Sequence, residues 1–363
     1  MLSPLVPLCN PRHFIYSTPS TMTVSPNVQT VDVVGVGLNA TDTLIPVAHY
    51  PARGAKVEIR PTTVLPGGQT ATAVVACQQW GLRTRYVGKV GGDSAAALHA
   101  AEFSRLGIEA HLLTAPDCPS QQAFILIDDA GERTVLWRRD HGLALLPEEL
   151  QRDWIIYSRA LHLDGHDTAA AAQAAAWARA AGVPVIADLD ELYPGVEALL
   201  PNVDYLITSR DIPGKLAAID DLQKSLPGVH RRFGCRLTAA TLGIDGVLAW
   251  DGAQFHYAPA FHVDTVDTTG AGDLFHAGFI YALLQGWPLP KQLDFACAAA
   301  ALNCTAVGAR GGIAPLAAIE RLLAAGPRHP SALWNDREQE LNSASSWTNR
   351  DDDVLSGREK KLG

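Results

Sequence analysis

Positive charge is scarce in this sequence of 363 residues, in which 29 Lys and Arg stand against 38 Asp and Glu and give a formal net charge of −9. Nucleic acids and anionic membranes attract proteins largely through clustered Lys and Arg, so neither is expected as the main partner. The chain also lacks an uncharged apolar run of about 18 residues, which argues against a membrane-spanning helix. Its first residues lack the basic segment and apolar stretch of a signal peptide, so none is expected.

Cysteine is also infrequent, and its spacing forms no metal or disulfide motif. The six cysteines are scattered and include no CxxC pair and no companion histidines at zinc-finger spacing: Cys9, Cys77, Cys118, Cys235, Cys297 and Cys304. We therefore expect free thiols in a reducing compartment, and a cytoplasmic protein.

The two ends differ in composition from the rest of the chain. Residues 1–28 are rich in Pro, Ser and Thr without apolar periodicity, and residues 335–363 are polar and charged, so a disordered leader and a disordered tail are predicted. Met22 is the only methionine besides Met1, and both stay candidates for the biological start. Residues 29–330 are predicted to form the folded domain, because 47% hydrophobic against 18% charged residues is a globular composition.

Within this domain, β-branched runs alternate with Ala- and Leu-rich helical stretches. Residues 160–164 read as a strand, residues 169–181 as a helix and residues 183–188 as the next strand. Such alternation predicts an α/β fold, with a doubly wound, mostly parallel sheet and helices on both faces. Residues 56–65 and 123–138 instead read as consecutive strands, the second with a turn at residues 128–131. They predict a small β-sheet lid, formed by about residues 43–66 and 121–140.

The strongest motif is Asp-Thr-Thr-Gly-Ala-Gly-Asp at residues 267–273, followed by a helical pattern that Gly286 and Pro288 end. A Gly-Ala-Gly turn that opens a helix leaves backbone N–H groups free to approach an anion closely, so it favours phosphate binding. Asp273 alone would more often be a dipole partner at a helix start. The complete motif favours a functional role instead.

These residues resemble the signature of the ribokinase family, the PfkB-type carbohydrate kinases. The resemblance covers about residues 31–325 and includes weaker segments in the family's order: residues 35–42, 66–68, 92–93, 241–246 and 308–309. It implies a ribokinase-like fold and an ATP-dependent kinase that phosphorylates a hydroxyl of a sugar.

The resemblance also implies roles for individual residues. Asp273 would be the catalytic base, and Gly270, Ala271 and Gly272 would form the anion hole. The remaining implied residues fall into three groups: Thr241, Gly243, Gly246 and Cys297 at the nucleotide; Asp267, Thr269, Asn303 and Gly308 at a monovalent cation such as K⁺; and Asp42, Gly67 and Gly68 at the sugar.

The chain departs from the family's pattern at two places. Thr72 stands where the family usually has Asn after two glycines, so a single hydroxyl replaces a two-headed amide in the expected acceptor site. The family's Asn-x-x-Glu segment, linked to Mg²⁺ and phosphate, should fall near residues 206–211, where neither residue type occurs. Asp211 is the best candidate there for supporting Mg²⁺.

Other motifs have competing interpretations. The glycines of residues 35–40, with Glu58 downstream, imitate a dinucleotide fingerprint, but a β-rich stretch and Pro46 follow where a helix is required. Residues 162–167 imitate a metal cluster without a fourth ligand. Asp164 is more simply a substrate contact at the carboxyl edge of the sheet. Arg138 and Arg139 are either solvated strand-end charges or contacts for an anionic substrate.

The sequence therefore predicts a carbohydrate kinase that uses ATP and Mg²⁺ on a small-molecule sugar. A nucleoside kinase of the same family and a non-catalytic sugar-sensing protein on the same scaffold are the alternatives. Because lid strands have an exposed edge, we expect a homodimer through the lid.

Overall fold

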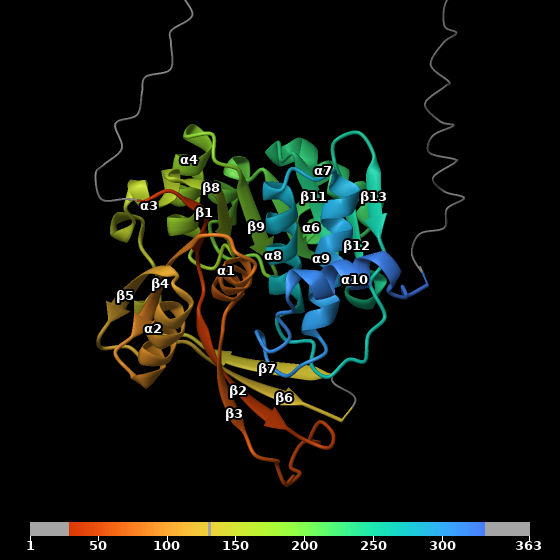
Figure 1. Ribbon diagram of the computed structural model, residues 1–363. Helices are drawn as coiled ribbons and strands as arrows, with labels where there is room; N and C mark the ends of the chain where they lie inside the picture. The colour runs from red at the N-terminus through yellow and green to blue at the C-terminus, as the bar shows by residue number, and fades with distance from the viewer. Residues whose placement is uncertain (1–28, 130–131, 331–363) are drawn as a thin grey trace, which may run out of the picture.

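The computed structural model describes residues 29–129 and 132–330 (Figure 1). The predicted leader and tail, Met22, Cys9 and the second half of the predicted turn at residues 128–131 lie outside the described residues. Of the helices in the described ranges, none is long and apolar enough to cross a membrane.

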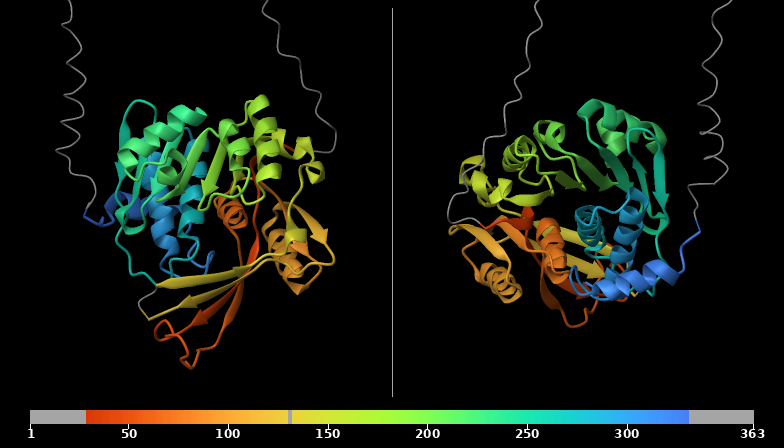
Figure 2. Two further views of the ribbon diagram at one scale, coloured as in Figure 1. Left: turned by 180° about the vertical axis from the view of Figure 1, so that it is seen from behind. Right: turned by 45° about the horizontal axis from the view of Figure 1, so that its top comes forward.

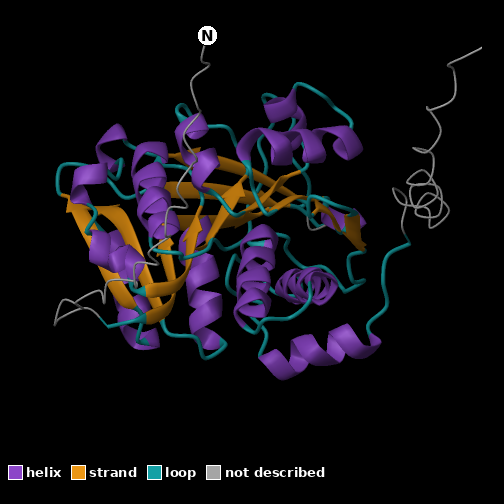
Figure 3. Ribbon diagram, turned by 90° about the horizontal axis from the view of Figure 1, so that it is seen from above, coloured by secondary structure: helices purple, strands orange, loops and turns teal. Residues whose placement is uncertain are grey.

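A nine-stranded sheet runs through the centre of the molecule, with helices on both of its sides (Figure 3). In spatial order its strands are β13 (Phe255–Ala258), β12 (Val247–Trp250), β11 (Leu237–Thr241), β10 (Tyr205–Ser209), β9 (Val185–Leu189), β8 (Ser158–Leu163), β1 (Val31–Val36), β4 (Thr84–Gly91) and β5 (Glu109–Ala115). The pairs from β11 to β5 are parallel, and β12 and β13 are antiparallel. The predicted doubly wound, mostly parallel sheet is confirmed.

Side chains of the parallel strands alternate between two cores. On β1, Val33 packs with helices α1, α8, α9 and α10, whereas its neighbour Val34 packs with α3 to α7. On β8, Ala160 and Leu161 divide in the same way. Both faces are covered, so neighbouring apolar residues of these strands, such as Val33 and Val34, face opposite cores instead of alternating with polar residues.

The helices have the following bounds: α1 (Gln69–Gln79), α2 (Ser94–Leu106), α3 (Arg152–Ile156), α4 (Thr168–Ala180), α5 (Val196–Leu199), α6 (Ile212–Ala217), α7 (Leu222–Phe233), α8 (Ala271–Leu284), α9 (Leu289–Asn303) and α10 (Leu316–Ala325). Short 3₁₀ turns are η1 (His141–Leu143), η2 (Pro147–Glu149), η3 (Leu200–Asn202) and η4 (Gly243–Asp245). The helices expected after residues 168 and 270 are therefore present.

A separate four-stranded sheet, here called the side sheet, projects from one end of the main body (Figures 1 and 2). Its strands, in spatial order, are β3 (Thr63–Gly67), β2 (Ala40–Pro46), β6 (Gln122–Ile127) and β7 (Arg133–Arg138). The prediction of a small second sheet is confirmed, but that of a strand over residues 56–65 is wrong in extent. Pro61 has no N–H to donate to a ladder, and regular pairing begins only at Thr63.

Candidate active site

The motif at residues 267–273 connects two distant parts of the chain. Asp267 is fully buried, and its Oδ1 accepts hydrogen bonds from the Thr269 N–H (2.8 Å) and hydroxyl (2.7 Å). Its Oδ2 accepts one from the Gly308 N–H at 2.7 Å. The carboxylate thus ties the 267–273 loop to the segment around residue 308.

Helix α8 begins inside this motif. Gly270, its N-cap, has a φ of 76°, and a Cβ there would collide with the backbone of Ala309, so only glycine fits. The first amide to close a helical turn is that of Leu274, which donates to the Gly270 carbonyl at 2.9 Å. Before it, the Ala271 N–H donates to the Thr268 carbonyl at 3.3 Å, and the Gly272 and Asp273 N–H groups form the open end of a helix, to which an anion is attracted.

Two cavities meet at this helix start. The Asp42 cavity, of about 420 Å³, lies between the side sheet and the carboxyl ends of the main strands, and the Cys297 cavity, of about 880 Å³, lies toward α9. Thr241 and Gly272 line both. Predicted site residues that line the Asp42 cavity are Asp42, Gly68, Thr241, Thr269, Gly270, Gly272 and Asp273. Those that line the Cys297 cavity are Thr241, Gly243, Gly246, Ala271, Gly272 and Cys297.

Two carboxyl groups in the Asp42 cavity have strongly raised pKa values. Burial raises the pKa of Asp273 to about 7, against the attraction of the Arg133 guanidinium, which lowers it. Burial likewise raises the pKa of Asp42 to about 6, while Arg310 and Arg133 oppose the shift. A carboxyl with a pKa near neutrality can accept and return a proton at physiological pH.

A buried acid and a buried histidine lie beneath the same helix start. Burial raises the pKa of Asp188 well above its ordinary value and lowers that of His276 to about 4, so His276 is neutral at pH 7. His276 Nδ1 lies 2.9 Å from the Gly272 carbonyl oxygen and 3.4 Å from the Asp188 carboxylate. Both residues line the Asp42 cavity, and the histidine holds the first turn of α8 in place.

Three residues predicted at the acceptor lie behind the cavity wall rather than on it. Thr72 is fully buried, and its hydroxyl accepts a hydrogen bond from Arg310 Nε at 3.1 Å. Asp164 accepts hydrogen bonds from the Leu38 N–H (2.5 Å) and the Thr70 hydroxyl (2.8 Å), so its carboxylate holds the segment after β1 to α1. Gly67 packs directly beneath Asp42, where a Cβ would collide with the carboxylate. Spacing along the chain could not distinguish residues that line the cavity from residues that lie behind the lining and hold it in place.

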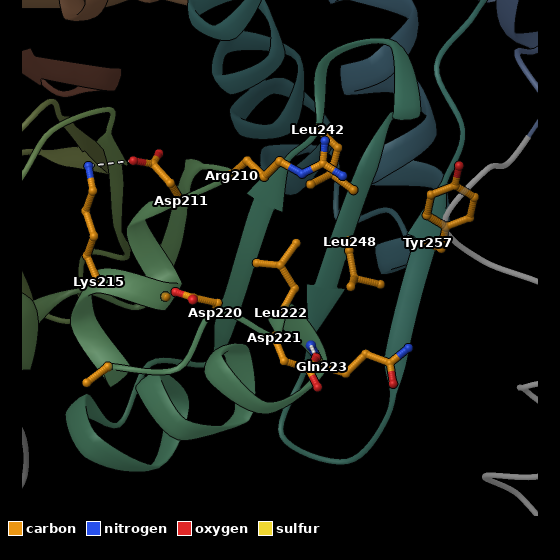
Figure 4. A pocket seen from close by; sticks show the side chains of 12 residues that line it. Arg210, Asp211, Lys215, Asp220, Asp221, Leu222, Gln223, Leu242, Leu248 and Tyr257 are labelled. Carbon is orange, nitrogen blue, oxygen red and sulfur yellow. Dashed lines mark hydrogen bonds and ion pairs between the residues drawn. The ribbon is translucent and has the colours of Figure 1, made fainter.

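Asp211 lies outside both cavities. It lines a different depression of about 980 Å³ between α6, α7, β12 and β13, where it pairs with Lys215 at 2.5 Å (Figure 4). The expectation that Asp211 supports Mg²⁺ stays a prediction, although Asp211 does not line the cavity that contains Asp273. Asp211 is the N-cap of α6, two residues beyond Ser209, which ends β10 and lines the Asp42 cavity.

The Asp267 surroundings fit a monovalent cation. Within the described ranges, the groups that donate to its buried carboxylate are neutral, and it forms no ion pair there that would offset its charge. Asn303 Nδ2 donates to the Thr269 and Ala309 carbonyls, at 2.9 and 3.1 Å, while its buried Oδ1 has no partner among the described residues. Carboxylate and carbonyl oxygens are suitable ligands for such an ion.

The competing motifs are accounted for by packing. Residues 40–46 form strand β2, so no helix follows the glycines of residues 35–37 as dinucleotide binding would require. A Cβ at Gly35 would collide with Thr70 and Val74 on α1, which explains the glycine there. In the described ranges, no group of three or more His, Cys, Asp or Glu is arranged to hold a metal ion.

Comparison with known proteins agrees with this geometry. Residues 30–315 match the pattern of the pfkB family carbohydrate kinases. The chain belongs to this family. The pfkB-family kinase is 29% identical over 287 residues to an ATP-dependent ribose-1-phosphate kinase of Halopiger xanaduensis, a match that covers 77% of this chain and 94% of the relative. It is 25% identical over 303 residues to the ribokinase of Haemophilus influenzae, which covers 78% and 95%.

Solved structures show the same ribokinase-like fold. The Arabidopsis thaliana ribokinase complexed with ribose and ATP superposes with a TM-score of 0.69 at 23% identity, over 82% of this chain and all of that one (100%). At this identity the likeness concerns the fold alone.

Sequence reasoning missed several residues that line the Asp42 cavity of this pfkB-family kinase. Arg133, Val135 and Trp137 reach it from alternate positions of β7. Alternate residues of a strand lie on the same face, so the spacing of these three residues was a signal that the sequence contains. Of the arginine pair at the strand end, Arg139 forms an ion pair with Asp167 at 2.7 Å.

Proposed function

We propose that this carbohydrate kinase transfers the γ-phosphoryl group of ATP to a hydroxyl of a sugar or sugar-like molecule, with Asp273 as the catalytic base. The observation that carries the proposal is the meeting of the two cavities at Gly272, beside a carboxyl whose pKa is raised to about 7. ATP would occupy the Cys297 cavity and the acceptor the Asp42 cavity. Their reacting groups would then meet at the start of α8.

Each part of the turn would have a defined task. As the acceptor oxygen bonds to phosphorus, Asp273 would receive its proton, and the bond from phosphorus to the leaving ADP oxygen would break. The N–H groups of Ala271 and Gly272 would stabilise negative charge on the moving phosphoryl group. Gly272 borders open space, which leaves room for that group.

Two ions belong to the proposal. Mg²⁺ would arrive with the phosphates of ATP, and the carboxylates of Asp188 and Asp273 face the cavity in which it would lie. K⁺ would be held at Asp267, Thr269, Asn303 and Gly308, where it would compensate the buried charge beside the anion hole.

On the acceptor side, Asp42 and Gly68 would bind sugar hydroxyls, and Arg133 would close over them from the side sheet, which would act as a lid. A nucleoside acceptor is the second candidate. It is favoured by an aromatic group in the same cavity: the rings of His166 and Tyr193 lie 4.4 Å apart, and those of His166 and Trp137 lie 5.8 Å apart. Such rings can stack on a base or on the face of a sugar.

A coupled assay of ADP release tests the function. Purified protein with Mg²⁺, K⁺ and ATP would be screened against ribose, ribose 1-phosphate, ketohexoses, sugar acids and nucleosides. We expect one class to stimulate ADP release at least about 100-fold over ATP alone, and Asp273→Asn to remove the stimulation. No stimulation by any class, or an unchanged rate in the variant, would contradict the proposal.

We also propose a homodimer through the outer face of the side sheet. Val64, Phe124 and Leu136 are 55%, 39% and 54% exposed. Through Thr43 they form a row across the sheet, on the face opposite the cavity-lining Ala123 and Trp137. Exposed apolar side chains that are contiguous indicate an interaction surface.

A further inference from the structure

Arg310 is a buried charge directly behind the acceptor side of the site. It follows Ala309, which lines the Asp42 cavity, and its own side chain is only 7% exposed. Its guanidinium forms an ion pair with Glu102 on α2, and donates from Nε to the Thr72 hydroxyl (3.1 Å) and from Nη2 to the Gly67 carbonyl (2.8 Å). One side chain thereby joins β3, α1 and α2 to the segment that packs on the anion hole.

The hydrogen bond to Gly67 lies at the connection between the side sheet and helix α1. Gly67 ends strand β3 of the side sheet, and Gly68, with a φ of 95°, begins the connection into α1. The Asp42 carboxylate packs against Gly67 so closely that no Cβ would fit between them. Whatever holds the Gly67 carbonyl therefore also sets the position of Asp42 and of the Gly68 backbone in the cavity.

The charge of Arg310 also interacts with the acidic residues of the site. Burying a guanidinium is costly unless it is paired, and Glu102 supplies one partner. The acids of the site, Asp42 and Asp273, lie near enough to act on its charge as well. In turn Arg310 is the largest influence that lowers the pKa of Asp42 against burial.

We propose that Arg310 is a positioning residue of the acceptor site, which holds the Gly67–Gly68 connection and the adjoining Asp42 carboxylate in place through its bonds to Gly67, Thr72 and Glu102. The inference rests on the proposed kinase function. It also assigns a role to Thr72. The hydroxyl that replaces the family's amide accepts a hydrogen bond from Arg310, so Thr72 would act on the substrate indirectly, by holding Arg310 in place.

The kinetic test compares Arg310→Met and Arg310→Lys with Arg85→Met. Arg85 is a matched control: its side chain is fully buried, pairs with Glu109 at 2.7 Å and donates to the Trp154 carbonyl at 2.7 Å, but it lies in the main sheet. With the best acceptor of the panel, Arg310→Met should raise the acceptor KM by about 10- to 100-fold and leave the ATP KM within about 2-fold. Arg85→Met should lower Tm and leave both KM values unchanged.

A pH profile separates positioning from simple destabilisation. The charged groups that act on Asp42 are Arg310, Arg133 and the Asp267 carboxylate. Arg310 lowers the pKa of both Asp42 and Asp273, so loss of its charge should raise both pKa values and move the acid limb of the acceptor kcat/KM to higher pH. Arg310→Lys keeps the positive charge but not all three contacts of the guanidinium. The acid limb should therefore return to its parent pH, while the acceptor KM should recover only in part. Proportional changes in both KM values, or an unshifted limb in Arg310→Met, would overturn the inference.

A measurement without substrate makes the inference independent of the proposed function. Hydrogen exchange by mass spectrometry would follow peptides that cover residues 63–72. Exchange there should be faster in Arg310→Met, and in Thr72→Val if Arg310→Met does not fold, but unchanged in Arg85→Met and Thr72→Ser. Unchanged exchange in folded Arg310→Met or Thr72→Val would overturn the positioning role. A parent enzyme that is inactive on every acceptor would instead count against the kinase proposal alone.

Discussion

Asp273 combines a position at the junction of two cavities with a pKa raised to about 7. Asn keeps its size but cannot take a proton, so Asp273→Asn should lower kcat by about 10² to 10⁴ fold. ATP affinity should stay the same or improve slightly, because a negative charge beside the γ-phosphate is removed. Steady-state turnover with the best acceptor, together with calorimetry of ATP binding, checks this. Turnover within a few fold of the parent would exclude Asp273 as the base.

The same residue should reduce stability at neutral pH. Burial raises its pKa from an ordinary 3.8 to about 7, so the folded state favours the protonated form. Its contribution to stability is therefore present at low pH and is lost as pH rises toward 7. Asp273→Asn should raise Tm by about 2–6 °C at pH 8 and by less at pH 5. An equal gain at both pH values would show that ionisation is not the cause.

At the scale of elements, strand β7 presents one arginine to the cavity and another to the opposite face. The Arg133 guanidinium lowers the pKa of Asp273, so Arg133→Gln should raise that pKa and move the acid limb of kcat/KM upward by about 0.5 to 1 pH unit. Arg138→Gln, at the other end of the strand and on its other face, is the control and should leave the limb in place. A pH profile of each variant from pH 5 to 9 provides the comparison.

The outer face of the side sheet carries its own prediction. Leu136 is 54% exposed and pairs across the strands with Phe124, so Leu136→Glu would place a charge within the proposed dimer contact. Sedimentation velocity should show a dimer for the parent and a monomer for the variant. Thr134→Glu, at the end of the same face, should weaken the dimer less. A parent that sediments as a monomer would contradict the proposed interface.

At the scale of the whole molecule, the described residues 29–129 and 132–330 enclose the two active-site cavities. We therefore expect a chain of residues 22–333 to keep its activity, and to keep its Tm within about 2 °C of the full chain. Circular dichroism melting and the coupled assay on both chains check this. Insoluble protein, or a large fall in Tm, would show that a removed segment contributes to the folded domain.

Local sequence determined the features that depend on neighbouring residues. The alternation of apolar runs with Ala-rich stretches predicted the doubly wound sheet, and the glycines of residues 270–272 predicted the helix start that faces an anion, because φ preferences and periodicity are local properties. Only the tertiary structure decided which groups share a cavity. Arg310 meets Thr72 across 238 positions of sequence, and Arg133 acts on Asp273 from another sheet. The raised pKa of Asp273 likewise depends on burial by distant elements, which no spacing along the chain encodes.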